Sequence, residues 1–235
     1  MNVIMEKEQL FKIEDIARYL GYKSAKMESE TLEVIEEIRE LFWNLNSWKV
    51  DYQVFLVKRT GEEVGLLNTP FFFQGKQIKE MLTDCEECIL MAVTLGSSID
   101  MQLRKLQIID MSKALIADAC ASSMVECICD QLEEILKKDY LEKGLYFTDR
   151  FSPGYGDFPL DTQKNFCAVL HTTKKVGIHV SSSGIMNPSK SITAVIGIAK
   201  EPQKMKIKGC AYCNLLANCN YRKGGKTCNG TIISE

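Results

Sequence analysis

The sequence predicts an α+β fold with a largely antiparallel sheet. Predicted helices and strands are mixed along the chain without the regular βαβ alternation that builds a parallel sheet. No internal repeat is visible, and no Gly-x-Gly-x-x-Gly turn of a dinucleotide-binding fold is found. With 235 residues, of which 46% are hydrophobic and 26% charged, the chain is long enough to bury a substantial core.

The amino-terminal third is expected to be mostly helical. Apolar residues at positions 13, 16, 17 and 20 form a helical stripe, and Gly21 ends it. A second helix is expected to begin at Ser29 or Thr31, with apolar residues at 32, 35, 38, 41 and 42. Two strands, 54–57 and 64–67, then surround a Thr-Gly turn, and a short helix is predicted over 77–82.

The centre of the sheet is predicted from an uninterrupted apolar run. Residues 88–95 have the length of a strand and are followed by Gly96, which indicates a strand buried on both faces. A long helix is expected from Asp110 to about Leu136, followed by a helix over 160–171. Two further strands, 176–180 and 192–198, are joined by a connector rich in Ser, Gly, Asn and Pro.

Charge and composition exclude several classes of function. The formal net charge of −2 disfavours nucleic-acid binding, which needs a basic face. No apolar run reaches the eighteen or so residues of a membrane span, and the amino terminus lacks the apolar core of a signal peptide. We therefore expect a cytoplasmic protein whose ten cysteines are buried or bind metal rather than forming disulfides.

The strongest candidate for a binding site is the heptapeptide Arg150-Phe-Ser-Pro-Gly-Tyr-Gly156. Its Pro and Gly residues predict a rigid turn that presents backbone groups, one guanidinium and the ring of Tyr155 to a small ligand. The alternative is a plain turn with an exposed arginine and a packing tyrosine. Two histidines at 171 and 179 show no nucleophile or metal pattern, so no catalytic constellation is predicted.

Two other segments could contribute to the same site. Glu126 lies in an otherwise small or apolar helical stretch, where a carboxylate must face solvent, form a pair, or hold a ligand's cation. Residues 181–183 are three serines followed by Gly184 and, further on, by Met186-Asn-Pro188 and Ser191. They could line the site or contact a partner, or form only a polar loop.

The R-x-[SA]-P-G-Y-[GP] loop and the following Met-x-Pro-x-x-Ser segment resemble the activation domain of cobalamin-dependent methionine synthase. The resemblance covers roughly residues 76–199. It implies a curved, largely antiparallel sheet flanked by helices, and binding of S-adenosylmethionine (AdoMet) during reductive methylation, the reactivation of oxidised cobalamin. It also implies that the chain is a free-standing component of methyltransferase activity. Cobalamin would be carried by the cobalamin-binding domain of a separate methionine synthase or related corrinoid protein, and an electron donor would be needed as a further partner.

The resemblance also implies roles for individual residues. Arg150 would bind the AdoMet carboxylate through two parallel hydrogen bonds, and the ring of Tyr155 would face the adenine or the sulfonium. Backbone groups of Ser152 and Gly154 would read the adenine edge, and Glu126 would contact the ligand. No residue is expected to act as a catalytic acid or base, because the chain's task is positioning.

The carboxyl-terminal tail carries a separate signal. Cys210-x2-Cys213-x5-Cys219-x8-Cys228 supplies four thiolates, which suit an iron–sulfur cluster or zinc, or bind no metal. Domains are thus expected at 1–75 (helices and hairpin), 76–200 (AdoMet-binding core) and 201–235 (cysteine-rich tail). The alternatives are an iron–sulfur electron-transfer activator of corrinoid proteins that does not bind AdoMet, and a non-catalytic adaptor with a structural zinc tail.

Overall fold

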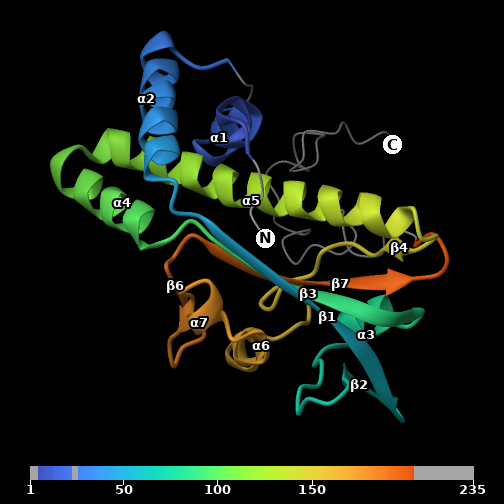
Figure 1. Ribbon diagram of the computed structural model, residues 1–235. Coiled ribbons are helices and arrows are strands. Elements are labelled where there is room, and N and C mark those ends of the chain that lie inside the picture. The colour runs from blue at the N-terminus through green and yellow to red at the C-terminus, as the bar shows by residue number, and fades with distance from the viewer. Residues whose placement is uncertain (1–4, 23–25, 204–235) are drawn as a thin grey trace.

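A computed structural model describes residues 5–22 and 26–203, and it has the predicted α+β architecture. Five antiparallel strands form one sheet in the order β2-β1-β3-β7-β4. Their bounds are β1 Lys49–Thr60, β2 Glu63–Leu66, β3 Cys85–Thr94, β4 Tyr146–Phe147 and β7 Ser191–Ala199. β1, β3 and β7 are the long members and cross the molecule with a marked twist (Figure 1).

One face of this sheet is covered by the longer helices. The 31-residue α5 runs along the sheet, with α1 and α2 packed on its outer side and α4 beside it (Figure 1). These helices and the preceding short 3-10 helix have the bounds η1 Lys7–Gln9, α1 Ile13–Tyr19, α2 Ser29–Leu45, α4 Ser97–Ile109 and α5 Met111–Leu141. Small residues of α5, among them Ala117, Ala121 and Ser123, are buried and let the neighbouring elements approach closely.

The opposite face is covered by shorter elements. They are α3 Lys76–Met81, η2 Leu160–Thr162, α6 Gln163–Leu170, α7 Thr172–Lys175 and a small sheet of β5 His179–Val180 with β6 Met186–Asn187. Phe71, Phe73, Phe158 and Phe166 meet there edge to face, with ring centroids 5.0–6.1 Å apart. β3 and β7 are therefore buried on both faces, which confirms the interpretation of the apolar run at 88–95.

Several elements differ from those predicted. The strand predicted at 54–57 extends over Lys49–Thr60, and the helix predicted at 160–171 is divided into η2 and α6. The long helix is preceded by a separate helix, α4, which the sequence analysis did not predict. Asp110 separates the two helices in an extended conformation (φ −157°), and its side chain accepts a hydrogen bond from the Lys113 N–H at 2.9 Å. The predicted strand 176–180 is reduced to two residues, because the N–H groups of residues 176–178 donate to the carbonyl of Thr172 in α7 and Gly177 takes a positive φ of 80°.

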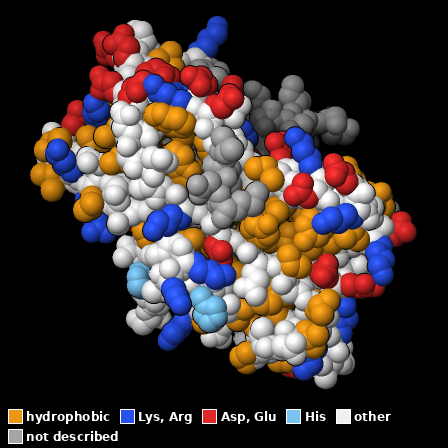
Figure 2. Space-filling model, in the orientation of Figure 1, with side chains coloured by type: hydrophobic (Ala, Val, Ile, Leu, Met, Phe, Trp, Pro, Cys, Tyr) orange, Lys and Arg blue, Asp and Glu red, His pale blue; other side chains and the backbone are white. Residues whose placement is uncertain are grey.

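The tip of the α4–α5 hairpin is apolar and exposed. Its side chains include Ile108, which is 86% exposed, together with Ile109, Met111 and Leu115, and Met101 is exposed earlier on α4. Hydrophobic side chains are also seen at the left edge of Figure 2, where Figure 1 places the turn between α4 and α5. Among the helices that the structure describes, none has the length and hydrophobicity required to cross a membrane. The expected boundary between residues 75 and 76 falls at the start of α3.

Candidate functional site

The loop that carries Arg150 lies along the edge of the main sheet. Phe151 exchanges two backbone hydrogen bonds with Val195 of β7, at 3.0 and 2.8 Å. Because successive side chains of an extended segment point to opposite faces, Arg150 is directed toward α5. Phe151 enters the core on the α3 and α6 side. The loop thus presents side chains to both faces of the sheet.

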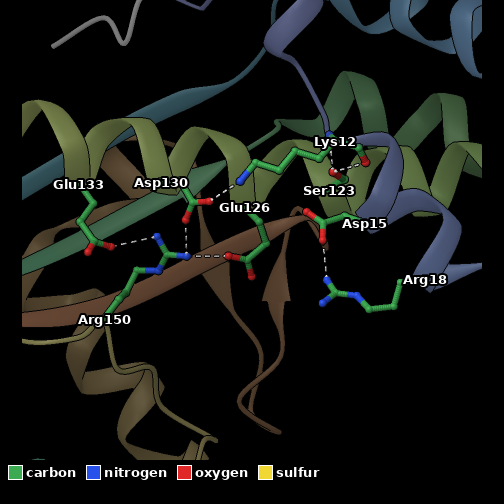
Figure 3. A network of polar contacts seen from close by, with 8 residues as sticks. All are labelled: Lys12, Asp15, Arg18, Ser123, Glu126, Asp130, Glu133 and Arg150. Atoms are coloured by element: carbon green, nitrogen blue, oxygen red, sulfur yellow. Dashed lines mark hydrogen bonds and ion pairs between the residues drawn. The ribbon is translucent and has the colours of Figure 1, made fainter. Parts of the chain in front are cut away.

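Arg150 is surrounded by three carboxylates of α5. Its Nη2 lies 2.7 Å from Glu126 Oε2 and 3.2 Å from Asp130 Oδ1, and its Nη1 lies 3.4 Å from Glu133 Oε2. These acidic residues are spaced four and three positions apart, so they share one face of the helix. The Arg150 side chain is only 11% exposed. We call Arg150 with Glu126, Asp130 and Glu133 the Arg150 cluster (Figure 3).

A further cation ties the amino-terminal segment to this cluster. Lys12 Nζ lies 3.0 Å from Asp130 Oδ2, and the Lys12 backbone N–H donates to Ser123 Oγ at 3.0 Å (Figure 3). Three carboxylates against two cations leave a formal charge of −1. The cluster therefore has an excess of one negative charge, which favours a further cationic group beside it.

The Glu126 carboxyl has an altered acidity. Burial raises its pKa, whereas the charge of Arg150 and its hydrogen bond to the carboxylate act in the opposite direction. Any additional positive charge placed next to this carboxylate would stabilise its ionised form. The site at Glu126 therefore favours a positively charged group.

Tyr155 occupies the other side of the sheet edge. Its exposed ring packs edge-on against Phe151, with centroids 6.0 Å apart and planes at 85°. The loop is closed by its own backbone: the Gly154 N–H donates to the Phe158 carbonyl at 2.8 Å, and the Tyr155 N–H to the Ser152 carbonyl at 3.1 Å. The Gly154 N–H is therefore used inside the loop.

The structure thus brings some predicted site residues together and separates others. Arg150 and Glu126 form an ion pair with each other, whereas Ser152, Gly154 and Tyr155 lie further along the loop. A ligand that contacts both groups must therefore extend around the edge of the sheet.

Three residues of this neighbourhood are not predicted from the sequence: Lys12, Asp130 and Glu133. The carboxylates could have been found, because positions 126, 130 and 133 follow helical spacing within a helix that was predicted. Lys12 could not, since it is more than a hundred positions away and no local pattern links it to α5.

The connector that precedes β7 is anchored by buried and half-buried acids. The buried Asp100 accepts hydrogen bonds from the Ser189 N–H at 2.7 Å and the Ser189 hydroxyl at 3.0 Å. Lys190 lies 2.9 Å from Asp118 and donates to Ser122 at 2.8 Å. The connector is thus fastened to α4 and α5 on the same face of the sheet as the Arg150 cluster.

The serines of the connector form a turn at the surface. The Ser181 and Ser183 hydroxyls are 2.9 Å apart, and the Gly184 N–H donates to the Ser181 carbonyl at 3.1 Å. An added Cβ at Gly184 would lie 3.2 Å from Leu160 Cγ, and one at Gly154 would lie 3.3 Å from Leu160 Cδ1. The Leu160 side chain therefore lies against both the turn at residues 181–184 (the serine turn) and the loop that begins at Arg150 (the Arg150 loop).

The cysteines that the structure describes are core residues. The side chains of Cys85, Cys88, Cys120, Cys127, Cys129 and Cys167 are all buried. Burial raises the thiol pKa, to about 12 for Cys120. Within residues 5–22 and 26–203 no cluster of His, Cys, Asp and Glu is suited to hold a metal ion. The predicted ligands Cys210, Cys213, Cys219 and Cys228 lie outside the described residues.

Comparisons with known proteins agree with this architecture. Residues 78–217 match the family described as "Vitamin B12 dependent methionine synthase, activation domain". Among solved structures, one described as "Crystal Structure of the MetH Reactivation Domain bound to AdoHcy" superposes with a TM-score of 0.68. The alignment has 11% identity and covers 95% of this chain and 84% of that one, so it shows a common fold. No curated protein matches the sequence. Because the family match spans more than half of the sequence, the chain belongs to the family of vitamin B12-dependent methionine synthase activation domains.

Proposed function

We propose that this chain binds AdoMet at the edge of its sheet and supports reductive methylation of cobalamin held by a methionine synthase or related corrinoid protein. The observation that carries the proposal is the Arg150 cluster, in which a nearly buried guanidinium and three carboxylates lie beside the loop of the family motif. The family match and the neighbour's bound AdoHcy support the choice of ligand.

The cluster has the charges that the methionine end of AdoMet needs. This part of the ligand carries a carboxylate, an ammonium and a sulfonium. We infer that the ligand carboxylate replaces Glu126 on Arg150, and that the freed Glu126 takes the ligand's ammonium. Such an exchange keeps each charge paired, which matters because an unpaired charge at a buried site is costly.

The adenosine end would follow the loop around the sheet edge. Tyr155 offers an exposed ring for stacking. Ser152 and Gly154 offer backbone groups to the adenine edge. In this arrangement the ligand spans the loop, with its charged end on the α5 side of the sheet and its adenine on the opposite side.

The partner would dock where apolar side chains surround the loop. Tyr155, Leu160 and Ile185 are all exposed, and Leu160 lies between the Arg150 loop and the serine turn. Exposed large apolar side chains gathered at one place are typical of a binding surface. We infer that the cobalamin-binding domain covers this surface and faces the bound ligand.

The chain's residues act by binding and orienting the methyl donor. The partner's cobalamin, once reduced by one electron, supplies the nucleophile, so this chain needs no general base. Arg150 and Glu126 would fix the methionine end, and Tyr155 would fix the adenosine end. The methyl group would then be held in one orientation toward the cobalt, and such positioning lowers the activation barrier of methyl transfer.

The test of ligand binding is calorimetric titration with AdoMet and with AdoHcy. We expect wild-type protein to bind both, and Arg150→Met to lose at least about tenfold in affinity because a charge-assisted pair is removed. Arg104→Met is the matched control, since Arg104 is exposed on α4, and it should bind like wild type. No heat from the wild-type protein would contradict the proposal.

The test of reactivation is an anaerobic assay with a candidate corrinoid partner and a reductant. We expect AdoMet-dependent methylation of oxidised cobalamin that requires this chain, and its loss in Arg150→Met. The iron–sulfur or zinc site at residues 210–228 stays a prediction, to be checked by metal analysis and visible absorption of wild type and Cys213→Ala.

A further inference from the structure

The Arg150 loop is also held at its far end, by a contact with α3. The Asp157 carboxylate accepts hydrogen bonds from the Lys76 N–H at 2.7 Å and the Gln77 N–H at 3.2 Å. In return, the Gln77 side-chain oxygen accepts the Asp157 N–H at 3.4 Å. This reciprocal exchange resembles a capping box, but here the cap is supplied by a residue about 80 positions along the chain.

Two glycines make this contact as close as it is. Gly75 has a φ of 104°, and an added Cβ there would lie 2.5 Å from the Asp157 carbonyl oxygen. Gly156 has a φ of 55°, and its added Cβ would lie 2.1 Å from the Gln77 side-chain oxygen. A side chain at position 75 would push the loop backbone away from α3, and one at position 156 would displace the Gln77 side chain that accepts the Asp157 N–H. The contact between Asp157 and α3 therefore depends on glycine at both positions.

The helix on the other side of the contact is itself firmly held. Ile78 and Met81 are buried in the core shared with Phe151 and Phe158. At its carboxyl end, Arg59 donates to the carbonyls of Leu82 at 2.5 Å and Cys85 at 2.6 Å. α3 is thus a fixed point against which the loop can be placed.

We propose that Asp157 is a positioning residue for ligand binding. Its carboxylate is engaged with two backbone N–H groups of α3, and it acts by holding Ser152, Gly154 and Tyr155 in place. The loop is then fixed at two points, by Arg150 on the α5 face and by Asp157 on the α3 face. This inference rests on the proposed function of the same loop.

The decisive experiment is titration with AdoHcy of wild type and three variants. Asp157→Ala should bind roughly tenfold more weakly, a loss of about 1.4 kcal/mol. Asp157→Asn should restore binding to within about threefold, because an amide oxygen caps a helix nearly as well as a carboxylate. Asp161→Ala removes the same charge four residues away, where the side chain is exposed, and should bind like wild type.

A second measurement follows the loop directly. Hydrogen exchange at the Gly154 and Tyr155 amides should speed up in Asp157→Ala and return toward wild type in Asp157→Asn. Unfolding in urea is measured for each variant, so that binding is compared where all are folded.

Three outcomes would overturn the inference. They are unchanged AdoHcy affinity in Asp157→Ala, equal losses in Asp157→Ala and Asp161→Ala, and no rescue by Asn. If the wild-type protein itself gave no heat, the proposed function would fall and this inference with it, so the two failures are distinguishable.

Discussion

Replacing Arg150 by Met tests whether the Arg150 cluster is a structural unit. The substitution keeps an apolar stem but leaves three carboxylates without their shared cation. Glu133 is 16% exposed, and losing a pair that is nearly buried on both sides costs about 2 kcal/mol when discounted from the fully buried case. The pairs with Glu126 and Asp130 are 43% and 46% exposed on the acidic side and add about 0.5 kcal/mol each. The expected loss is about 3 kcal/mol at neutral pH.

The assay is urea unfolding followed by the fluorescence of Trp43 and Trp48. With a slope of about 2 kcal/mol/M, the midpoint should fall by about 1.5 M. Arg104→Met should change it little, because substitutions of exposed side chains cost less than about 0.5 kcal/mol. A loss below about 1 kcal/mol for Arg150→Met would refute the account of the cluster.

The pH dependence of this loss has a definite sign. Burial raises the pKa of Glu126 in the folded state, and Arg150 counteracts that rise. Without Arg150 the folded-state pKa of Glu126 should rise further. A raised folded pKa means that the folded state binds the proton more tightly, so stability is gained as the pH falls through that pKa and lost as it rises. The destabilisation by Arg150→Met should therefore be largest at neutral pH and shrink as the pH approaches the ordinary carboxyl pKa of about 4.3.

Three further substitutions test other contacts by the same urea assay. Asp100→Ala leaves the Ser189 N–H without its partner and should cost about 2 kcal/mol, and a value near zero would contradict the anchoring of the connector. Gly197→Ala should cost about 1–3 kcal/mol, because the added Cβ would lie 2.5 Å from Cys85 Sγ; wild-type stability would mean that the core yields more than its packing suggests. Lys12→Met removes only an exposed ion pair and should cost less than about 1 kcal/mol, so a larger loss would show that Lys12 is essential to the cluster.

The main sheet was predictable because its signals are local. The apolar run at 88–95 gave the buried central strand, and the turn at Thr60-Gly61 gave the β1–β2 hairpin. The helix α4 was missed because its stripe of buried residues, at 99, 103 and 106, is narrow and its exposed side also carries large apolar residues such as Ile108. Periodicity is weak when a helix is apolar on more than one side.

The candidate site was only partly predictable. The Pro and Gly residues predict the turn at 150–156, and the sequence predicts Arg150 and Glu126 as separate ligand-binding groups. Their direct ion pair was not predicted, because it depends on α5 crossing the sheet edge, a tertiary arrangement with no local sequence signal. The same holds for Asp157, whose partners on α3 are about 80 positions away.

The measurement that tests the central claim most directly is a crystal structure of the protein with AdoHcy. The account predicts the ligand's carboxylate on the Arg150 guanidinium, its ammonium at Glu126, and its adenine against the ring of Tyr155. A structure with the ligand bound elsewhere, and with Arg150 still paired to Glu126, Asp130 and Glu133, would contradict it.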